Sequence, residues 1–311
     1  EAMKVLRRGK ARAALLIAMA DIAGAWDLDA VTRALSVFAD TCLDMCLRFM
    51  LKSQAASGKC VLADGDTPES TCGITVIAMG KYGAFELNYS SDIDIVVFFD
   101  PERVPVINGG DDSGDAQKLA IRITKNIVAL MQEATGDGYV FRTDLRLRPD
   151  AGATQIALSI DAAAFYYETM GQNWERAAWI KARACAGDKT VGNEFLKSLE
   201  PFIWRRHLDY AAIEDIHSIK RQIHAHKGHT VIAIEGHNIK LGRGGIREIE
   251  FFAQTQQLIG GGRDPSLKDN TTVGALGALT RLGIVKPEVR DDLVSAYRFL
   301  REVEHRLQMV H

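Results

Sequence analysis

Residues 80–99 decide the fold of this chain, and they read Gly-Lys-Tyr-Gly-Ala-Phe-Glu-Leu-Asn-Tyr-Ser-Ser-Asp-Ile-Asp-Ile-Val-Val-Phe-Phe. The end of this stretch is apolar and rich in β-branched and aromatic residues, which predicts a buried strand. Asp92 and Asp94 stand at the head of that strand. Because strand side chains alternate between faces, both carboxylates project to the same side. Neighbouring carboxylates repel each other unless a cation lies between them, and hard oxygen ligands of this kind favour Mg²⁺ or Mn²⁺.

A second short strand, predicted for residues 74–79, runs directly into the turn at Gly80 and Lys81. Two strands therefore flank a glycine-containing loop that also carries Ser90 and Ser91. Glycine in such a loop lets backbone N–H groups approach phosphate oxygens. A solvated Asp-x-Asp turn is the alternative interpretation of Asp92 and Asp94, and it leaves this loop unexplained.

A third acid follows in residues 139–149, which read Tyr-Val-Phe-Arg-Thr-Asp-Leu-Arg-Leu-Arg-Pro. Their alternation predicts a strand with Asp144 and the guanidinium groups of Arg142, Arg146 and Arg148 on one surface. An edge strand with a charged outer face would look the same. Arginines around one acid also form a phosphate clamp beside a metal ligand. Two-metal phosphoryl or nucleotidyl transfer needs at least three such carboxylates, and the ordered set resembles the layout of a polymerase-β-type nucleotidyltransferase.

The segments on either side of this core are predicted to be helical. A long helix before residue 50 is indicated by Asp29 as N-cap and by a stripe of apolar residues at helical spacing: Val31, Leu35, Phe38, Cys42, Met45 and Phe49. A helix is also predicted over 172–186, and the successive helices after it span 194–206, 211–226, 246–259, 271–282 and 288–310. We therefore expect an α+β chain with an N-terminal helical segment (1–58), a catalytic domain with a small mixed sheet (59–190) and a C-terminal helical bundle (191–311).

Composition excludes several classes of function. The chain has 311 residues, 47% of them hydrophobic, and a formal net charge of -2, which favours neither nucleic acid nor a membrane surface as partner. The longest apolar stretch near the start is too short to span a bilayer. Five cysteines without a C-x-x-C pair argue for a reducing compartment, so the expected location is cytoplasmic.

Several motifs together resemble a known family, the bifunctional glutamine synthetase adenylyltransferase/adenylyl-removing enzymes. The resemblance covers nearly the whole chain and is carried by the motifs at 80–83, 86–94, 142–149, 173–176 with 181–183, 238–242 and 245–251. Enzymes of this family are tandem halves, one of which attaches AMP from ATP to a tyrosine of glutamine synthetase, while the other removes it by phosphorolysis. Ser-Ser-Asp-Ile-Asp at 90–94 and Gly-Ile-Arg-Glu-Ile-Glu-Phe at 245–251 resemble the removing half.

The resemblance implies a site and a reaction. Asp92, Asp94 and Asp144 would be catalytic and would hold Mg²⁺ or Mn²⁺. Inorganic phosphate would attack the adenylyl phosphorus, a tyrosine phenolate would leave, and ADP would be released. The residues expected to contact nucleotide or phosphate are Gly80, Lys81, Ser90, Ser91, Arg146, Arg148, Lys181 and Arg183, although salt bridges within the domain are an alternative role for the last four.

Other interpretations stay open on the sequence alone. The chain could be the transferring half, which uses ATP, or a docking module for glutamine synthetase or a PII-type signal protein. A glycine-rich turn at 242–245 lacks the strand context of a dinucleotide fingerprint and is interpreted as a tight turn. Histidines at 217, 224, 226, 229 and 237 match no zinc spacing and are interpreted as part of a solvated helix end.

Overall fold

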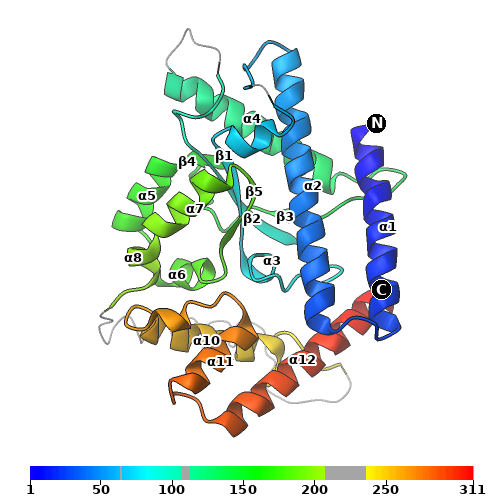
Figure 1. Cartoon of the computed structure of the whole chain (residues 1–311), viewed down its shortest axis with the longest axis vertical. Helices are drawn as coiled ribbons and strands as arrows, with labels where there is room; N and C mark the ends of the chain where they lie inside the picture. The colour runs from blue at the N-terminus through cyan, green and yellow to red at the C-terminus, as the bar shows by residue number, and fades with distance from the viewer. Residues whose placement is uncertain (64, 107–111, 207–235, 311) are drawn as a thin grey trace. The chain divides into compact units, whose positions relative to one another are not determined.

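The structure, a computed structural model, describes residues 1–63, 65–106, 112–206 and 236–310 (Figure 1). The chain divides into two compact units. The first, which we call the sheet unit, comprises Glu1–Met170 and Ala182–Leu199. The second, the helical unit, comprises Gly171–Lys181 and Glu200–His311. The helix predicted for 211–226 lies outside the described residues.

A five-stranded mixed sheet forms the centre of the sheet unit. Its strands are β1 (Ile74–Ala78), β2 (Ile93–Phe99), β3 (Thr143–Asp144), β4 (Ala157–Ser159) and β5 (Arg183–Gly187). The order is β3-β2-β1-β5, and β4 also pairs with β2. β1 is antiparallel to β2 and β5, whereas β3 and β4 run parallel to β2. A small mixed sheet combined with many helices confirms the predicted α+β class.

Helices cover both faces of this sheet. The sheet unit contains α1 (Ala2–Ile22), α2 (Leu28–Ala56), η1 (Pro68–Thr71), α3 (Gly80–Gly83), α4 (Asp112–Gln132), α5 (Ile160–Thr169) and α7 (Lys189–Ser198). α1 and α2 lie side by side, and α2 contacts both α4 and β5 (Figure 1). On this side Ile93, Ile95 and Val97 are buried with α2 and α4. On the opposite side Phe98 packs against Phe195 of α7, with ring centroids 4.6 Å apart. The alternation of β2 is therefore that of a strand between two helical layers.

The long N-terminal helix is α2, and its pattern departs from the prediction at both ends. Its N-cap is Asp27, whose Oδ1 accepts a hydrogen bond from the backbone N–H of Ala30 at 2.8 Å, rather than Asp29. The predicted apolar stripe is buried at Val31 and Leu35, but Met45 is 49% exposed. Cys42 of the predicted stripe is also buried, and the buried face then continues through residues 43, 46, 47, 50 and 51.

Two predicted elements are shorter or of another type. Within 139–149 only Thr143 and Asp144 form a strand, because Asp144 Oδ1 accepts the N–H of Arg146 at 2.8 Å and the chain turns at once. The predicted helix over 172–186 ends at Trp179, and residues 183–187 form β5. Pairing with β1 there overrides the weak strand propensity of an Ala- and Cys-containing run.

The described part of the helical unit contains α6 (Asn173–Trp179), α8 (Glu200–Ile203), α10 (Ile246–Gly260), η2 (Pro265–Leu267), α11 (Thr272–Arg281) and α12 (Pro287–Val310). Ile246 and Ile249 of α10 form an apolar core with Ala275, Leu276 and Tyr297. No helix in the described ranges is both long and apolar enough to cross a bilayer.

Candidate functional site

Two of the three predicted acids are direct neighbours in the sheet. Because β2 and β3 are parallel and in register, Asp94 and Asp144 are Cα partners, as are Ile93 and Thr143. Ile93 and Ile95 are buried on the opposite face, so Asp94 projects away from the core formed with α2 and α4. Asp94 and Asp144 are half-buried, whereas Asp92 is exposed just before β2. The strand register therefore brings together acids that are 50 residues apart in the sequence.

The carboxylate of Asp94 lies against the backbone of Gly80. Gly80 begins α3 with φ +54°, and a Cβ built on it would lie 2.9 Å from Asp94 Oδ2. The backbone N–H of Met79 also donates to the carbonyl oxygen of Asp94 at 2.9 Å. Both the positive φ and the close approach require glycine here. The turn predicted to contact phosphate is thus held directly beside one of the three acids.

Arg142 was predicted to lie on the charged surface, but it was not among the residues expected to contact nucleotide or phosphate. Its Nε donates to Asp92 Oδ1, its Nη2 donates to the carbonyl oxygen of Ser90 at 2.7 Å, and its Nη1 lies 3.3 Å from the Tyr139 hydroxyl. The hydrogen bond with Asp92 raises the pKa of Arg142 above its ordinary value. The alternation of 139–149 placed Arg142 on the charged surface, but only the β2–β3 register shows that Asp92 is its partner.

Arg146 is paired with Asp144 and lies near the other two acids. Its backbone N–H and its Nε donate to Asp144 Oδ1 at 2.8 and 3.0 Å, and its Nε and Nη2 donate to Oδ2. These hydrogen bonds hold the pKa of Asp144 below its usual value. The pKa of Arg146 is raised, first by the hydrogen bond with Asp144 and also by the negative charges of Asp94 and Asp92. All three carboxylates therefore act on one guanidinium, whose side chain is 85% exposed.

The three carboxylates are of a chemical type that binds divalent cations, but their side chains are not arranged around a common point. Among the described residues, no three His, Cys, Asp or Glu side chains form a metal-holding group as they stand. Asp92 and Asp144 instead bind arginines. Carboxylate oxygens, which all three acids offer, are of the type that Mg²⁺ and Mn²⁺ prefer. The Arg146 side chain is 85% exposed, so its ion pair with Asp144 is open to solvent.

The remaining predicted residues fall into two groups. Lys81 of α3 and Ser91 are half-buried and Ser90 is exposed, all within the segment between β1 and β2. Three basic residues have firm contacts of their own. Arg148 donates to the carbonyl oxygens of Leu145 and Ala151 at 2.8 and 2.7 Å. Arg183 forms an ion pair with Asp40 at 2.7 Å. Lys181 belongs to the helical unit and lies 3.4 Å from Glu250 and 3.2 Å from Thr272.

The glycine-rich turn at 242–245 is the tight turn that the sequence predicts. The N–H of Gly245 donates to the carbonyl oxygen of Gly242 at 3.0 Å, and the N–H of Gly244 donates to Glu248 Oε2 at 2.8 Å. The Glu248 carboxylate therefore occupies the start of α10. Of the histidines considered, only His237 lies within the described residues, and the other four fall in 207–235.

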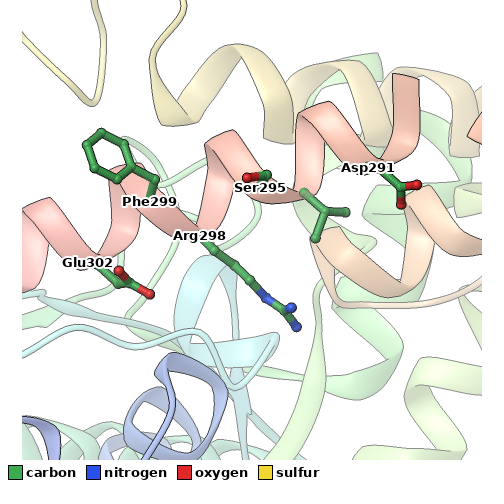
Figure 2. A pocket seen from close by; sticks show the side chains of 6 residues that line it. Asp291, Ser295, Arg298, Phe299 and Glu302 are labelled. Carbon is green, nitrogen blue, oxygen red and sulfur yellow. The ribbon is translucent and has the colours of Figure 1, made fainter. Parts of the chain in front are cut away.

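A pocket of about 400 Å³ lies along α12 in the helical unit (Figure 2). It is lined by Asp291, Val294, Ser295, Arg298, Phe299 and Glu302. The lining contains none of the predicted site residues. Figure 2 shows Phe299 and Arg298 extending in different directions from the helix, so the lining side chains do not converge on one point.

Comparison with known proteins identifies the family. A family model described as glutamate-ammonia ligase adenylyltransferase matches residues 1–198, which include the whole acidic site. The chain belongs to this family. A relative from Xanthobacter autotrophicus is 57% identical over 310 residues, and one from Agrobacterium fabrum is 56% identical over 310 residues. Both are named bifunctional glutamine synthetase adenylyltransferase/adenylyl-removing enzyme.

The relatives of this family member are much longer than the chain itself. The alignments cover 100% of the chain but only 31% of each of these two relatives. A second family model, described as GlnD PII-uridylyltransferase, matches residues 216–311. The adenylyltransferase match and the uridylyltransferase match therefore fall on successive parts of the chain.

Proposed function

We propose that this chain removes AMP from adenylylated glutamine synthetase by metal-dependent phosphorolysis, releasing ADP, and so takes part in the regulation of nitrogen assimilation. The observation that carries the proposal is the parallel pairing of Asp94 with Asp144, with the Gly80 turn against Asp94. The arrangement supports a polymerase-β-type nucleotidyltransferase core. The names of the relatives support both adding and removing AMP. Ser90-Ser91-Asp92 and the motif at 245–251 favour removal.

In the proposed reaction an oxygen of inorganic phosphate attacks the adenylyl phosphorus, and the bond from phosphorus to the tyrosine oxygen breaks. The new P–O–P bond makes ADP, and the phenolate takes a proton from water. Mg²⁺ or Mn²⁺ held by Asp92, Asp94 and Asp144 would supply positive charge at the phosphoryl oxygens. The chain's own cations have a second role. Arg146, once released from Asp144, is an exposed guanidinium suited to bind the incoming phosphate in bidentate fashion.

The test is to mix the chain with adenylylated glutamine synthetase, Mg²⁺ and phosphate and to measure ADP. We expect ADP from the native sequence and a loss of about a thousandfold or more in D92N and D94N, because each variant removes a charged ligand from the reacting centre. Absence of ADP from a folded sample, with AMP transferred from ATP to unmodified glutamine synthetase, would assign the transferring reaction instead.

A second function is favoured by the match of residues 216–311 to the PII-uridylyltransferase family. We propose that this part of the chain contacts a PII-type signal protein. Binding measured by calorimetry should persist in D94N, because that substitution lies in the sheet unit. If D94N abolishes both activity and binding, the two functions are not separable in this way.

Five free, buried cysteines support a cytoplasmic location.

A further inference from the structure

Helix α2 carries a polar stripe that faces the loop between β1 and β2 and the strand β5. Ser36, Asp40 and Asp44 follow each other at four-residue spacing and so share one face of the helix. Ser36 Oγ accepts the backbone N–H of Leu87 at 3.4 Å, and Asp44 Oδ1 accepts the N–H of Gly187 at 2.8 Å. A helix that is outside the predicted catalytic domain therefore binds the backbone of the segment between β1 and β2 and that of the end of β5.

Asp40 makes the strongest contacts of this stripe. Its Oδ1 accepts the hydroxyl of Tyr82 at 2.6 Å, and its two oxygens accept Nη1 and Nη2 of Arg183, each at 2.7 Å. Tyr82 is fully buried, while the Arg183 and Asp40 side chains are 14% and 16% exposed. The bidentate ion pair of Arg183 with Asp40 fixes the relative orientation of these two side chains. Burial raises the pKa of Tyr82 well above its ordinary value, so the phenol remains protonated as the donor to Asp40.

Arg183 extends this contact to the other end of the α3 turn. Its Nη2 lies 3.4 Å from the carbonyl oxygen of Tyr82, and its Cζ lies 3.9 Å from the ring centroid of Phe85. Arg33 of α2 lies 4.6 Å from the same ring. Phe85 has φ +58°, a left-handed conformation that a bulky side chain adopts only when its surroundings enforce it. Two guanidinium groups over the ring provide such surroundings.

We propose that Asp40 is a positioning residue for the candidate site. Through Tyr82 and Arg183 it fixes the turn from Gly80 to Phe85, and with it the place of Gly80 and Lys81 beside Asp94. Both terminal nitrogens of Arg183 bind Asp40. The proposal therefore assigns Arg183 to holding the turn rather than to contacting phosphate. The catalytic consequence rests on the proposed function, whereas the structural one does not.

The experiment compares D40N and Y82F with D44N in the whole chain. D44N is the matched control, since Asp44 lies on the same stripe but contacts Gly187 and Lys189 of the β5–α7 region. Hydrogen exchange of the peptide 79–88 is measured by mass spectrometry. Loss of a charged hydrogen bond predicts exchange about tenfold faster in D40N, and a smaller acceleration in Y82F. In D44N this peptide should exchange as in the native sequence.

The kinetic readout is the KM for inorganic phosphate. A displaced Gly80–Lys81 turn should raise it by about tenfold in D40N, with the KM for adenylylated glutamine synthetase unchanged. Unchanged exchange of 79–88 in both D40N and Y82F would overturn the proposal, as would an equal acceleration in D44N. If D40N does not fold, Y82F decides, because it keeps the ring and removes one hydroxyl. If the native chain releases no ADP, the proposed function fails while the exchange result still tests the positioning role.

Discussion

Replacement of Arg7 by methionine is predicted to destabilise the end of α4 and the strand that carries Asp144. Arg7 is 1% exposed and all its partners are main-chain carbonyl oxygens. It donates to Gly138 at 2.7 Å, to Met3 at 3.0 Å, to Leu130 at 3.3 Å and to Glu133. Three of these carbonyls belong to the C-terminal end of α4 and the turn that follows it. A buried cation there also interacts favourably with the helix dipole.

The expected cost follows from these contacts. A hydrogen bond from a charged donor contributes about 1.5–3 kcal/mol, and the carbonyls left without it stay partly buried. Relief of the buried charge offsets part of the loss. We therefore expect R7M, which keeps the apolar stem of the side chain, to lower the free energy of unfolding by about 2–4 kcal/mol. R8M is the matched control, because Arg8 lies 3.9 Å from Asp137 with its side chain 59% exposed, and its loss should cost under about 0.5 kcal/mol.

The assay is urea unfolding combined with hydrogen exchange of the peptides that cover 112–132 and 139–146. The second peptide is included because the Thr143 hydroxyl donates a hydrogen bond of 2.8 Å to Gln132 Oε1. The end of α4 therefore holds β3 in place. R7M should accelerate exchange in both peptides and R8M in neither. A cost below about 1 kcal/mol, or equal effects of R7M and R8M, would refute the reasoning, because a buried cation on several carbonyls should exceed one exposed ion pair.

Three further outcomes are expected. G80A should lower turnover at least about tenfold and the free energy of unfolding by only about 1–2 kcal/mol, since the new methyl group meets the Asp94 carboxylate at a positive φ. G9A is the control, because a Cβ at Gly9 meets nothing within 4 Å. Native turnover in G80A would contradict the account. In metal-free protein, R146A should raise the pKa of Asp144, because the guanidinium that lowers it is gone, and an unshifted carboxyl titration by NMR would argue against the pair. Native protein should react slowly with a thiol reagent, since burial raises the pKa of four thiols to about 12, those of Cys42, Cys46, Cys72 and Cys185. Rapid labelling of any of these four would contradict their burial.

Local sequence was sufficient where one element contains the whole signal. The strand that starts at Ile93 is confirmed because its apolar run is buried between two helical layers. The outward direction of Asp94 follows from alternation along this strand, whereas Asp92 lies just before the strand, where alternation does not apply. The α+β class is confirmed for the same reason, since helical and strand periods occupy separate stretches. The turn at Gly80 was also predictable from the sequence. The sequence did not show why glycine is required there, which is the close approach of the Asp94 carboxylate to the Gly80 backbone.

Contacts between distant segments were not predictable in the same way. The ion pair of Arg142 with Asp92 depends on the β2–β3 register, and β5 forms only because β1 offers it an edge. Asp144 looked like the middle of a long strand, but its own side chain accepts the N–H two residues on and ends the strand. The role of α2 was missed because its polar stripe has meaning only once the loop at 80–87 lies against it.

The most direct test of the central claim is to supply phosphate labelled with ³²P to the chain, Mg²⁺ and adenylylated glutamine synthetase. Phosphorolysis predicts that the label appears in the β-phosphate of ADP, in amounts equal to the tyrosines released, and that D94N abolishes it. Release of unlabelled AMP would mean hydrolysis. Absence of labelled ADP, from a sample that in a parallel assay transfers AMP from ATP to unmodified glutamine synthetase, would mean the opposite reaction. Either result would contradict the proposal that this chain removes AMP by phosphorolysis.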